Sequence, residues 1–155
     1  MELELKRGGR TARVETLGGE LVSYRDERGL EYIWGGDPAY WPGRNPLLFP
    51  IVGMLKEGKI RFDGREYAME RHGFARRREF TPAARGEDWV RLELRESAET
   101  LALYPYPFRL AVEQRLTDTG FSTAVTVANP GEGPLPFCLG AHTGFRCPLE
   151  AGERF

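Results

Sequence analysis

The sequence is poor in several residue types and patterns, and each shortage argues against a class of protein. Its 155 residues include only two cysteines and two histidines. With 22 basic and 23 acidic side chains the formal net charge is −1, so no excess of positive charge attracts nucleic acid. No apolar run approaches the ~20 residues that span a bilayer. We therefore expect neither nucleic acid nor a membrane among its partners.

The N-terminus and the cysteines favour a cytoplasmic protein. Residues 1–6 alternate apolar and charged side chains, whereas a secretory signal places a basic stretch before an apolar one. Cys138 and Cys147 are able to pair, but two thiols in a chain without a signal favour the free, reduced state. Neither thiol belongs to a C-x-x-C motif, and the presence of only two histidines argues against a dedicated zinc site. We expect no metal and no organic cofactor.

The residues that are abundant indicate short strands joined by tight turns. Glycine (19) and proline (11) are frequent, and aromatic residues make up 12% of the chain. Period-two alternation and β-branched residues predict an all-β, antiparallel fold in one domain, residues 1–155. One or two helical turns are expected over 97–103, capped by Ser97 or Thr100. The expected strands cover 2–7, 13–15, 21–25, 31–34, 47–52, 59–62, 65–69, 88–95, 108–117 and 121–129.

Three local features refine this expectation. Asp63-Gly64 predicts a type I′ hairpin turn, in which both central residues need positive φ. Pro50 interrupts the apolar segment 47–52, so this segment is an edge, a strand end or a buried loop. Residues 149–155 show no strand pattern, and an all-β domain that stops there leaves open sheet edges, which pair readily with other chains.

The two histidines carry the clearest functional signal. His72 opens the motif His-Gly-Phe-Ala-Arg, which ends at Arg76, and His142 lies within Gly-Ala-His-Thr-Gly-Phe, residues 140–145. Histidine titrates near neutrality and is the usual proton donor or acceptor of a working site. Nearby glycines permit close approach of a ligand, and Arg76 adds a fixed positive charge. The alternative interpretation of each histidine is a structural residue that only hydrogen-bonds to the backbone.

Other motifs support weaker interpretations. A run of three arginines, 76–78, suits a phosphate or nucleic-acid patch, but in a strand these residues alternate faces, which favours a solvated surface for Arg77 or Arg78. The aromatic residues Trp34, Tyr40 and Trp41 suit stacking on a sugar, although core packing is the favoured interpretation. The glycines at 53 and 58 lack the G-K-[ST] ending of a phosphate-binding loop. No segment resembles a serine nucleophile elbow.

Together, these motifs resemble the aldose 1-epimerase (galactose mutarotase-like) family. The stretch Pro46–Gly53, the turn at 63–64 and the His72–Arg76 motif resemble one signature of the family. Residues 140–145 resemble its second signature, Gly-x-His-x-x-Phe. The likeness runs over most of the chain and corresponds to the N-terminal half of such a protein. It implies an antiparallel β-sandwich of the galactose mutarotase-like type, incomplete in this chain, with a hexose bound in an open cleft.

The resemblance also implies an activity and assigns roles. The family interconverts α and β anomers of an aldohexose or a modified sugar by acid/base ring opening. By resemblance His142 is the general acid at the ring oxygen, and His72 holds or polarises the same region of the sugar. Arg76 supports the site or contacts an anionic substituent. The remaining substrate-binding candidates are Arg44, Asn45 and Phe145.

Two departures from the family pattern limit this interpretation. The catalytic carboxylate base and a sugar-binding aspartate of the family come from the later half, which this chain lacks. Met54 stands where relatives often carry an arginine, and Arg44 is the candidate replacement for that cation. The alternatives are a carbohydrate-binding protein without catalysis, and a structural β-sandwich fragment that pairs with a partner chain, including a second copy, through open sheet edges.

Overall fold

The computed structural model describes residues 1–147, which form antiparallel strands and short helical segments. The first strands are β1 (Glu2–Arg7), β2 (Arg10–Glu15), β3 (Glu20–Arg25), β4 (Leu47–Leu48), β5 (Lys59–Phe62) and β6 (Arg65–Ala68). They are followed by β7 (Thr81–Arg85), β8 (Trp89–Arg95), β9 (Arg109–Leu116), β10 (Phe121–Ala128) and β11 (Gly140–Ala141). The helical segments are α1 (Ala98–Leu103) and two 3₁₀ turns, η1 (Lys56–Gly58) and η2 (Ala75–Arg77).

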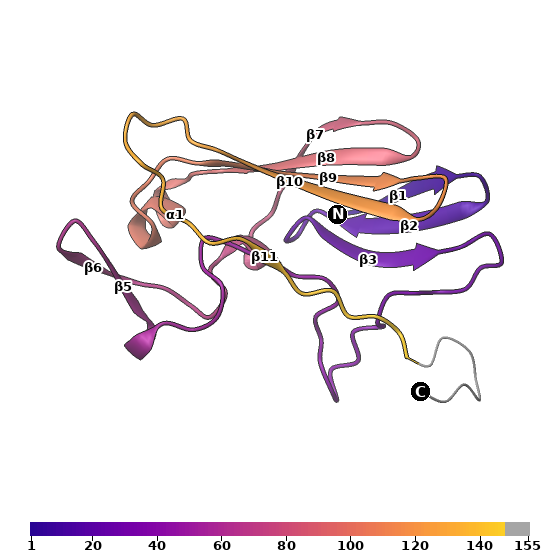
Figure 1. Cartoon of the computed structure of the whole chain (residues 1–155), viewed down its shortest axis with the longest axis horizontal. Helices are drawn as coiled ribbons and strands as arrows, with labels where there is room; N and C mark the ends of the chain where they lie inside the picture. Colours follow the sequence, from indigo (N-terminus) through magenta and orange to yellow (C-terminus); the bar gives the residue numbers. More distant parts are fainter. Residues whose placement is uncertain (148–155) are drawn as a thin grey trace.

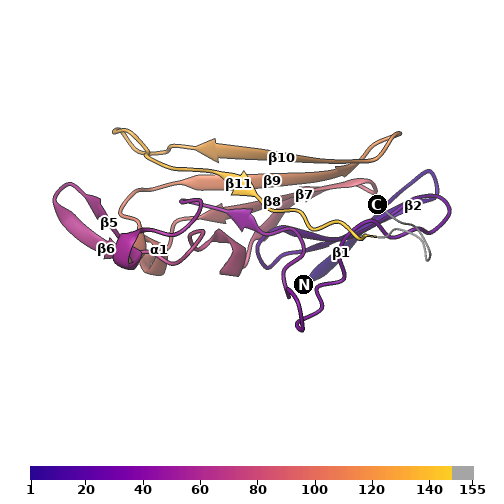
Figure 2. The ribbon, with the colours of Figure 1, turned by 60° about the horizontal axis from the view of Figure 1, so that its bottom comes forward.

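Two antiparallel sheets pack together as layers of a sandwich. One has the order β10-β9-β8-β7, and the other has the order β1-β2-β3. Figures 1 and 2 show the three-stranded sheet at one end of the longer sheet and the β5–β6 hairpin at the other. The short pair β11-β4 lies between these ends. No helix within residues 1–147 is long and apolar enough to cross a membrane.

The core follows from the alternation of the strands. Every second residue of β1, β2, β8 and β9 faces inward, because successive side chains of a strand point to opposite faces. Burying each leucine or valine among them contributes about 1.5–3 kcal/mol. The fully or nearly fully buried ones include Leu5, Ala12, Val14, Val90, Leu92, Leu110, Val112 and Leu116.

An aromatic cluster fills the core beneath α1 and the β5–β6 hairpin. The Phe49 ring centroid lies 5.2 Å from that of Phe108 and 6.1 Å from that of Tyr104, and the rings of Phe62 and Phe74 also pack on Tyr104. The Tyr104 hydroxyl donates to the carbonyl of Pro136 at 2.8 Å, and burial raises the pKa of this phenol. Since aromatic pairs add about 0.5–1.5 kcal/mol beyond area burial, this cluster holds Phe49 firmly in place.

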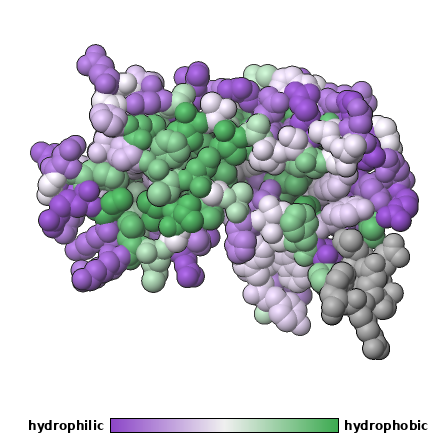
Figure 3. Space-filling view, in the orientation of Figure 1, coloured by the Kyte–Doolittle hydropathy of each residue, from purple (hydrophilic) through white to green (hydrophobic). Residues whose placement is uncertain are grey.

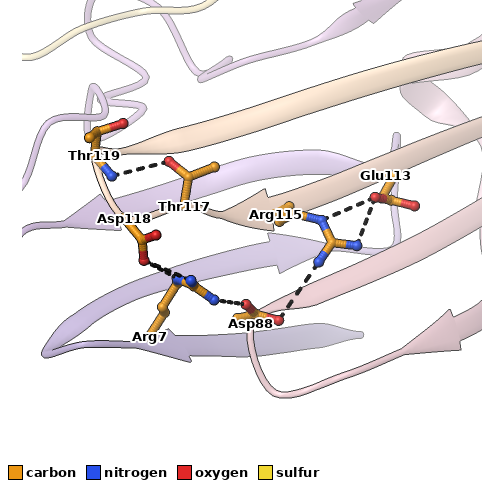
Figure 4. Close-up of polar contacts among 7 residues, drawn as sticks. All are labelled: Arg7, Asp88, Glu113, Arg115, Thr117, Asp118 and Thr119. Carbon is orange, nitrogen blue, oxygen red and sulfur yellow. Dashed lines mark hydrogen bonds and ion pairs between the residues drawn. The ribbon is translucent and has the colours of Figure 1, made fainter.

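A charged network joins the two sheets at their far end (Figure 4). The Arg7 guanidinium, at the end of β1, donates to Asp88 at 2.6 Å and to Asp118 at 2.7 Å. Arg115 reaches Glu113 at 3.0 Å and Asp88 at 3.9 Å, and it lies over the Trp89 ring at 5.0 Å from the centroid.

Several local predictions are confirmed. Asp63 and Gly64 both have positive φ, at 46° and 79°, as a type I′ turn requires. Helix α1 begins after Ser97, whose side chain accepts from the N–H of Thr100 while the Thr100 hydroxyl accepts from the N–H of Ser97. Both cysteines are free and exposed. The prediction for residues 149–155 lies outside the described residues.

Other local predictions were wrong or were confirmed only in part. The expected strand at 31–34 forms only isolated bridges, from Glu31 to Arg25 and from Ile33 to Phe145. The segment 47–52 is in part a strand, as Leu47–Leu48, and in part a buried loop, residues 49–51 with a cis peptide bond before Pro50, so two of the alternatives expected for it both occur. Residues 76–77 belong to the turn η2 instead of a strand, and strand β7, with the sequence TPAAR, was not predicted.

Candidate functional site

One extended segment, residues 44–50, holds both histidine motifs. On one side it pairs antiparallel with residues 138–144. At one end of this pairing the Cys138 N–H donates to the Pro50 carbonyl at 2.8 Å, and at the other the Gly144 N–H donates to the Arg44 carbonyl at 2.7 Å. On its other side the Phe49 carbonyl accepts from the N–H groups of residues 74 and 75, at 3.0 and 3.2 Å. The segment therefore carries the His72 motif along one flank and the His142 motif along the other.

His72 is fixed by a reciprocal pair of hydrogen bonds with Gly53. The His72 N–H donates to the Gly53 carbonyl at 2.8 Å, and the Gly53 N–H donates to the His72 Nδ1 at 2.9 Å. An Nδ1 that accepts carries no proton, so the neutral ring bears its proton on Nε2. His72 has a φ of 66°, an uncommon conformation for a residue with a side chain. Such backbone geometry persists only where the surroundings impose it, and it is frequent at binding sites.

The surroundings of His72 favour its neutral form. Burial lowers the pKa of His72, and the positive charges of Arg76 and Arg71 lower it further, with a contribution from His142. The Arg76 guanidinium donates to the Arg71 carbonyl at 2.9 Å, and its buried Nε has no hydrogen-bond partner within residues 1–147. Arg76 thus closes the 71–76 loop behind His72. At neutral pH, His72 presents an Nε2–H donor.

His142 lies on the opposite flank and stacks on an aromatic ring. Its N–H donates to the Pro46 carbonyl at 3.2 Å, which continues the β11–β4 pairing by one step. The centroid of its ring is 4.9 Å from the Trp41 ring, with 34° between the planes. A Cβ at Gly144 would approach Trp41 to 2.7 Å, so Trp41 packs closely over this segment. The His142 imidazole is otherwise exposed.

The candidates Asn45 and Phe145 line a hollow that neither histidine borders. The Thr143 hydroxyl donates to the Asn45 Oδ1 at 2.6 Å, and both residues border a cavity of about 280 Å³. The cavity lies at the small end of the range for ligand pockets, about 300–1,000 Å³. Phe145 is 68% exposed at its rim. The aromatic residues Tyr24, Tyr32 and Phe121 complete its apolar wall.

The Arg44 side chain packs against the loop that precedes it. Its guanidinium carbon would lie 3.0 Å from a Cβ at Gly36, which places it against the 36–42 loop. The structure thus groups His72, Arg76 and His142 around the central segment, with Asn45 and Phe145 at the cavity beside it. Two larger surface hollows, of about 570 and 560 Å³, include none of these residues. The part of the chain that the structure describes has no group of three or more potential metal ligands.

Two residues that support the site were not singled out from the sequence. The Glu20 carboxylate accepts from the N–H groups of Arg44 and Asn45, at 2.9 and 2.6 Å, and so anchors the start of the central segment to β3. Thr143 holds the Asn45 side chain, as described above. Glu20 lies 24 residues from Arg44 in the sequence, and no local pattern connects them. Of the two, only Thr143 lies inside a motif that the sequence had already singled out, because it is next to His142.

The three aromatic residues of the 34–41 loop divide between packing and exposure. Trp34 and Trp41 are half-buried, and the Trp34 indole N–H donates to the Trp41 carbonyl at 2.8 Å. Tyr40 is 83% exposed, so the favoured expectation of core packing was wrong for this residue.

With this arrangement in view, the comparison with known families is decisive. The aldose 1-epimerase family profile matches residues 1–153. The chain belongs to this family. Curated relatives agree: Protein LacX of Lactococcus lactis subsp. lactis, in a plasmid and a chromosomal form, is 39% and 38% identical over 161 residues. Each alignment covers 100% of this chain and 54% of the relative.

Solved structures of the epimerase family share the fold closely. A galactose mutarotase related enzyme from Lactobacillus acidophilus superposes with a TM-score of 0.95 at 28% identity, over 99% of this chain and 52% of that one. A galactose mutarotase-like protein from Lactobacillus casei ATCC 334 gives 0.92 at 33% identity, over 97% and 52%. The chain therefore has the expected galactose mutarotase-like β-sandwich and spans about half the length of the relatives it matches.

Proposed function

We propose that this chain carries the acid-bearing wall of a sugar epimerase site, which interconverts the α and β anomers of an aldohexose or a modified sugar. The observation that supports this most directly is that the central segment 44–50, together with Gly53 just after it, holds His72 on one flank and His142 on the other. Membership of the aldose 1-epimerase family supports the same reaction. Because the chain spans about half of its relatives, the activity and the substrate are both part of the proposal.

The proposed roles follow from the chemistry of ring opening. A proton must reach the ring oxygen as the bond from this oxygen to the anomeric carbon breaks, while the anomeric hydroxyl loses its proton and becomes a carbonyl. His142, exposed beside Trp41, donates the proton to the ring oxygen in its charged form. The neutral His72 donates its Nε2–H to an oxygen of the same region. Arg76 positions His72, and Asn45, Arg44 and Phe145 are the proposed substrate-binding residues.

The base of this reaction is proposed to lie outside the described residues. Within residues 1–147, no hydrogen bond or ion pair joins either histidine to a carboxylate. A general acid acting by itself contributes at the low end of the ~10²–10⁴-fold that acid/base catalysis provides. We therefore expect the 155-residue chain to accelerate anomer exchange modestly.

The test is the rate of anomer exchange of freshly dissolved α-glucose and α-galactose, followed by polarimetry or NMR. The wild-type chain should exceed the buffer rate, and His142→Ala should lose at least about tenfold of the acceleration. His142→Gln, which keeps a hydrogen-bonding side chain without an acid of suitable pKa, should lose as much. Equal rates for wild type and His142→Ala would refute the catalytic role.

A carbohydrate-binding protein without catalysis is the second candidate, favoured by the same shortage of carboxylates at the histidines. It predicts that a sugar raises the melting temperature without accelerating anomer exchange. A ligand at 100 times its Kd stabilises the folded state by about 2.7 kcal/mol, which a thermal melt resolves easily. A cytoplasmic location, a single domain and a site that needs no cofactor remain predictions from the sequence.

A further inference from the structure

The start of the central segment is held by a single side-chain oxygen. The Glu20 Oε1 atom accepts from two successive backbone N–H groups, that of Arg44 at 2.9 Å and that of Asn45 at 2.6 Å. Successive N–H groups that converge on one anion form a concavity of the kind that backbone turns offer to anions. The chain bends at these two residues, between the 36–42 loop and β4. Glu20 therefore holds the bend through which the chain enters the site.

Glu20 also supplies a hydrogen bond that the strand pairing leaves out. In an antiparallel ladder, two residues of a hydrogen-bonded pair exchange both N–H···O bonds. The Gly144 N–H donates to the Arg44 carbonyl at 2.7 Å, but the Gly144 carbonyl accepts from the Trp34 N–H at 3.0 Å. The Arg44 N–H donates to Glu20 instead. The carboxylate thus takes the place of the missing half of this pair.

The backbone that carries Glu20 is fixed independently of its side chain. Glu20 is the first residue of β3, which pairs with β2. The Gly19 carbonyl accepts from the side-chain amide of Gln114 at 2.9 Å, and Gln114 is buried in β9. The Gly18 N–H donates to the Arg78 carbonyl at 2.8 Å. Loss of the Glu20 carboxylate should therefore release the bend and leave β3 in place.

The contacts that hold His142 begin close to this bend. The His142 N–H donates to the carbonyl of Pro46, the residue directly after the bend. Trp41, whose ring stacks on the His142 imidazole, lies three residues before the bend. Next to His142, the Thr143 hydroxyl donates to the Asn45 Oδ1 at 2.6 Å. The bend therefore determines where the His142 imidazole lies relative to the central segment.

His72 depends on the other end of the central segment. It exchanges two hydrogen bonds with Gly53, and residues 74 and 75 of its motif donate to the Phe49 carbonyl. Figure 3 shows apolar side chains gathered over the half of the molecule that holds β4 and β11 in Figure 1, so packing also supports this end. The two histidines are thus held at opposite ends of one segment, and Glu20 acts on the end that holds His142.

We propose that Glu20 is a positioning residue of the epimerase site: its carboxylate holds the bend at 44–45 and thereby places His142 relative to His72. The effect on catalysis rests on the proposed function, in which His142 donates a proton to the ring oxygen. A misplacement of about 1 Å at a reacting centre costs up to ~10²-fold in rate. One oxygen accepts both bonds, so the length of the side chain matters more than its charge.

The experiment records the two imidazole resonances in a ¹H–¹³C spectrum of the full 155-residue chain, together with the rate of anomer exchange. Glu20→Ala removes the acceptor, so the His142 resonance should shift, that of His72 should stay in place, and the acceleration should fall about tenfold. Glu20→Asp keeps the charge but is one methylene shorter and no longer reaches both N–H groups, so it should behave like Glu20→Ala. Glu20→Gln keeps the length and one acceptor oxygen, and it should restore the His142 resonance and most of the acceleration.

Asp26→Ala is the matched control, at the other end of β3. The Asp26 Oδ1 atom also accepts from two backbone N–H groups, that of Arg28 at 3.0 Å and that of Leu30 at 2.9 Å. Its loss should lower the melting temperature and leave both imidazole resonances in place. Circular dichroism should show which variants fold, and if Glu20→Ala does not, the comparison of Glu20→Asp with Glu20→Gln decides.

Three results would overturn the proposal: a His142 resonance that Glu20→Asp leaves in place, a shift in Glu20→Gln as large as that in Glu20→Asp, or the same shift in Asp26→Ala. An exchange rate that Glu20→Asp leaves unchanged would also contradict it. Failure of the proposed function is distinguishable from these results. A wild-type chain that exchanges anomers only at the buffer rate would refute that function, while the resonances still decide whether Glu20 positions His142.

Discussion

The close approach of Gly73 to the central segment gives a sharp prediction about how His72 is held. A Cβ at this position would lie 2.2 Å from the Phe49 carbonyl oxygen and 2.5 Å from its carbonyl carbon, and the glycine has a φ of +71°. The Gly73→Ala variant therefore has two costs: the left-handed conformation, about 1–2 kcal/mol, and displacement of buried backbone, about 1–3 kcal/mol. We expect a total loss of about 2–5 kcal/mol in the free energy of unfolding.

Gly64→Ala is the matched control for this prediction. Gly64 has a φ of +79°, and a Cβ there would meet nothing within 4 Å, so only the conformational cost of about 1–2 kcal/mol applies. At about 2.1 cal/mol/K per residue, the unfolding entropy of this chain is about 0.33 kcal/mol/K, so each kcal/mol shifts Tm by about 3 °C.

The assay is a thermal melt of the two variants and of the wild type. The melting temperature of Gly73→Ala should lie about 3–9 °C below that of Gly64→Ala, because the two variants differ only by the cost of displacing the backbone. The His72 imidazole resonance should also move in Gly73→Ala and stay in place in Gly64→Ala. Equal melting temperatures for the two variants would refute the steric argument, and with it the claim that backbone contact positions His72.

Three further predictions concern the charged network between the two sheets and the two histidines. In a double-mutant cycle measured by urea unfolding, Arg7→Ala and Asp88→Ala should show a favourable coupling energy, because the two side chains form an ion pair at 2.6 Å (Figure 4); zero coupling would contradict this. The contribution of neutral His72 to the free energy of unfolding should be fully present above pH 6.5, the ordinary pKa of histidine, and should be lost as the pH falls through the lower pKa of folded His72. Urea unfolding at pH 5 and pH 7.5 should therefore show a smaller pH dependence of the unfolding free energy in His72→Gln than in the wild type. Trp41→Leu should shift the His142 imidazole resonance and leave that of His72 unchanged, and two unaffected resonances would mean that the rings do not stack.

The sequence predicted the strands whose alternation is clear and failed where packing replaces pattern. β8 alternates buried and partly exposed residues, β9 does so over its second half, and both strands were expected. β7 contains a proline and two alanines, so neither alternation nor β-propensity marks it, and its pairing with β8 alone makes it a strand. Residues 31–34 have the pattern of a strand, but their neighbours offer only single bridges.

The same distinction applies to the site. The histidine motifs are local, and their sequences were sufficient to nominate His72 and His142 as candidates. The contacts that orient them are not local: Gly53 lies 19 residues from His72, and Trp41 lies 101 residues before His142. Arg44 was a reasonable candidate by position, but its side chain lies against Gly36, a direction that only the folded loop reveals.

The central claim is that His72 and His142 face one sugar, and the chain allows a direct measurement because it contains only two histidines. Each imidazole gives its own resolved resonance in a ¹H–¹³C spectrum, and the variants His72→Gln and His142→Gln assign the two signals. During titration with glucose, galactose or a sugar phosphate, both signals should shift together and saturate at the same sugar concentration. Signals that stay in place with every sugar, or that saturate at different concentrations, would contradict a shared sugar site.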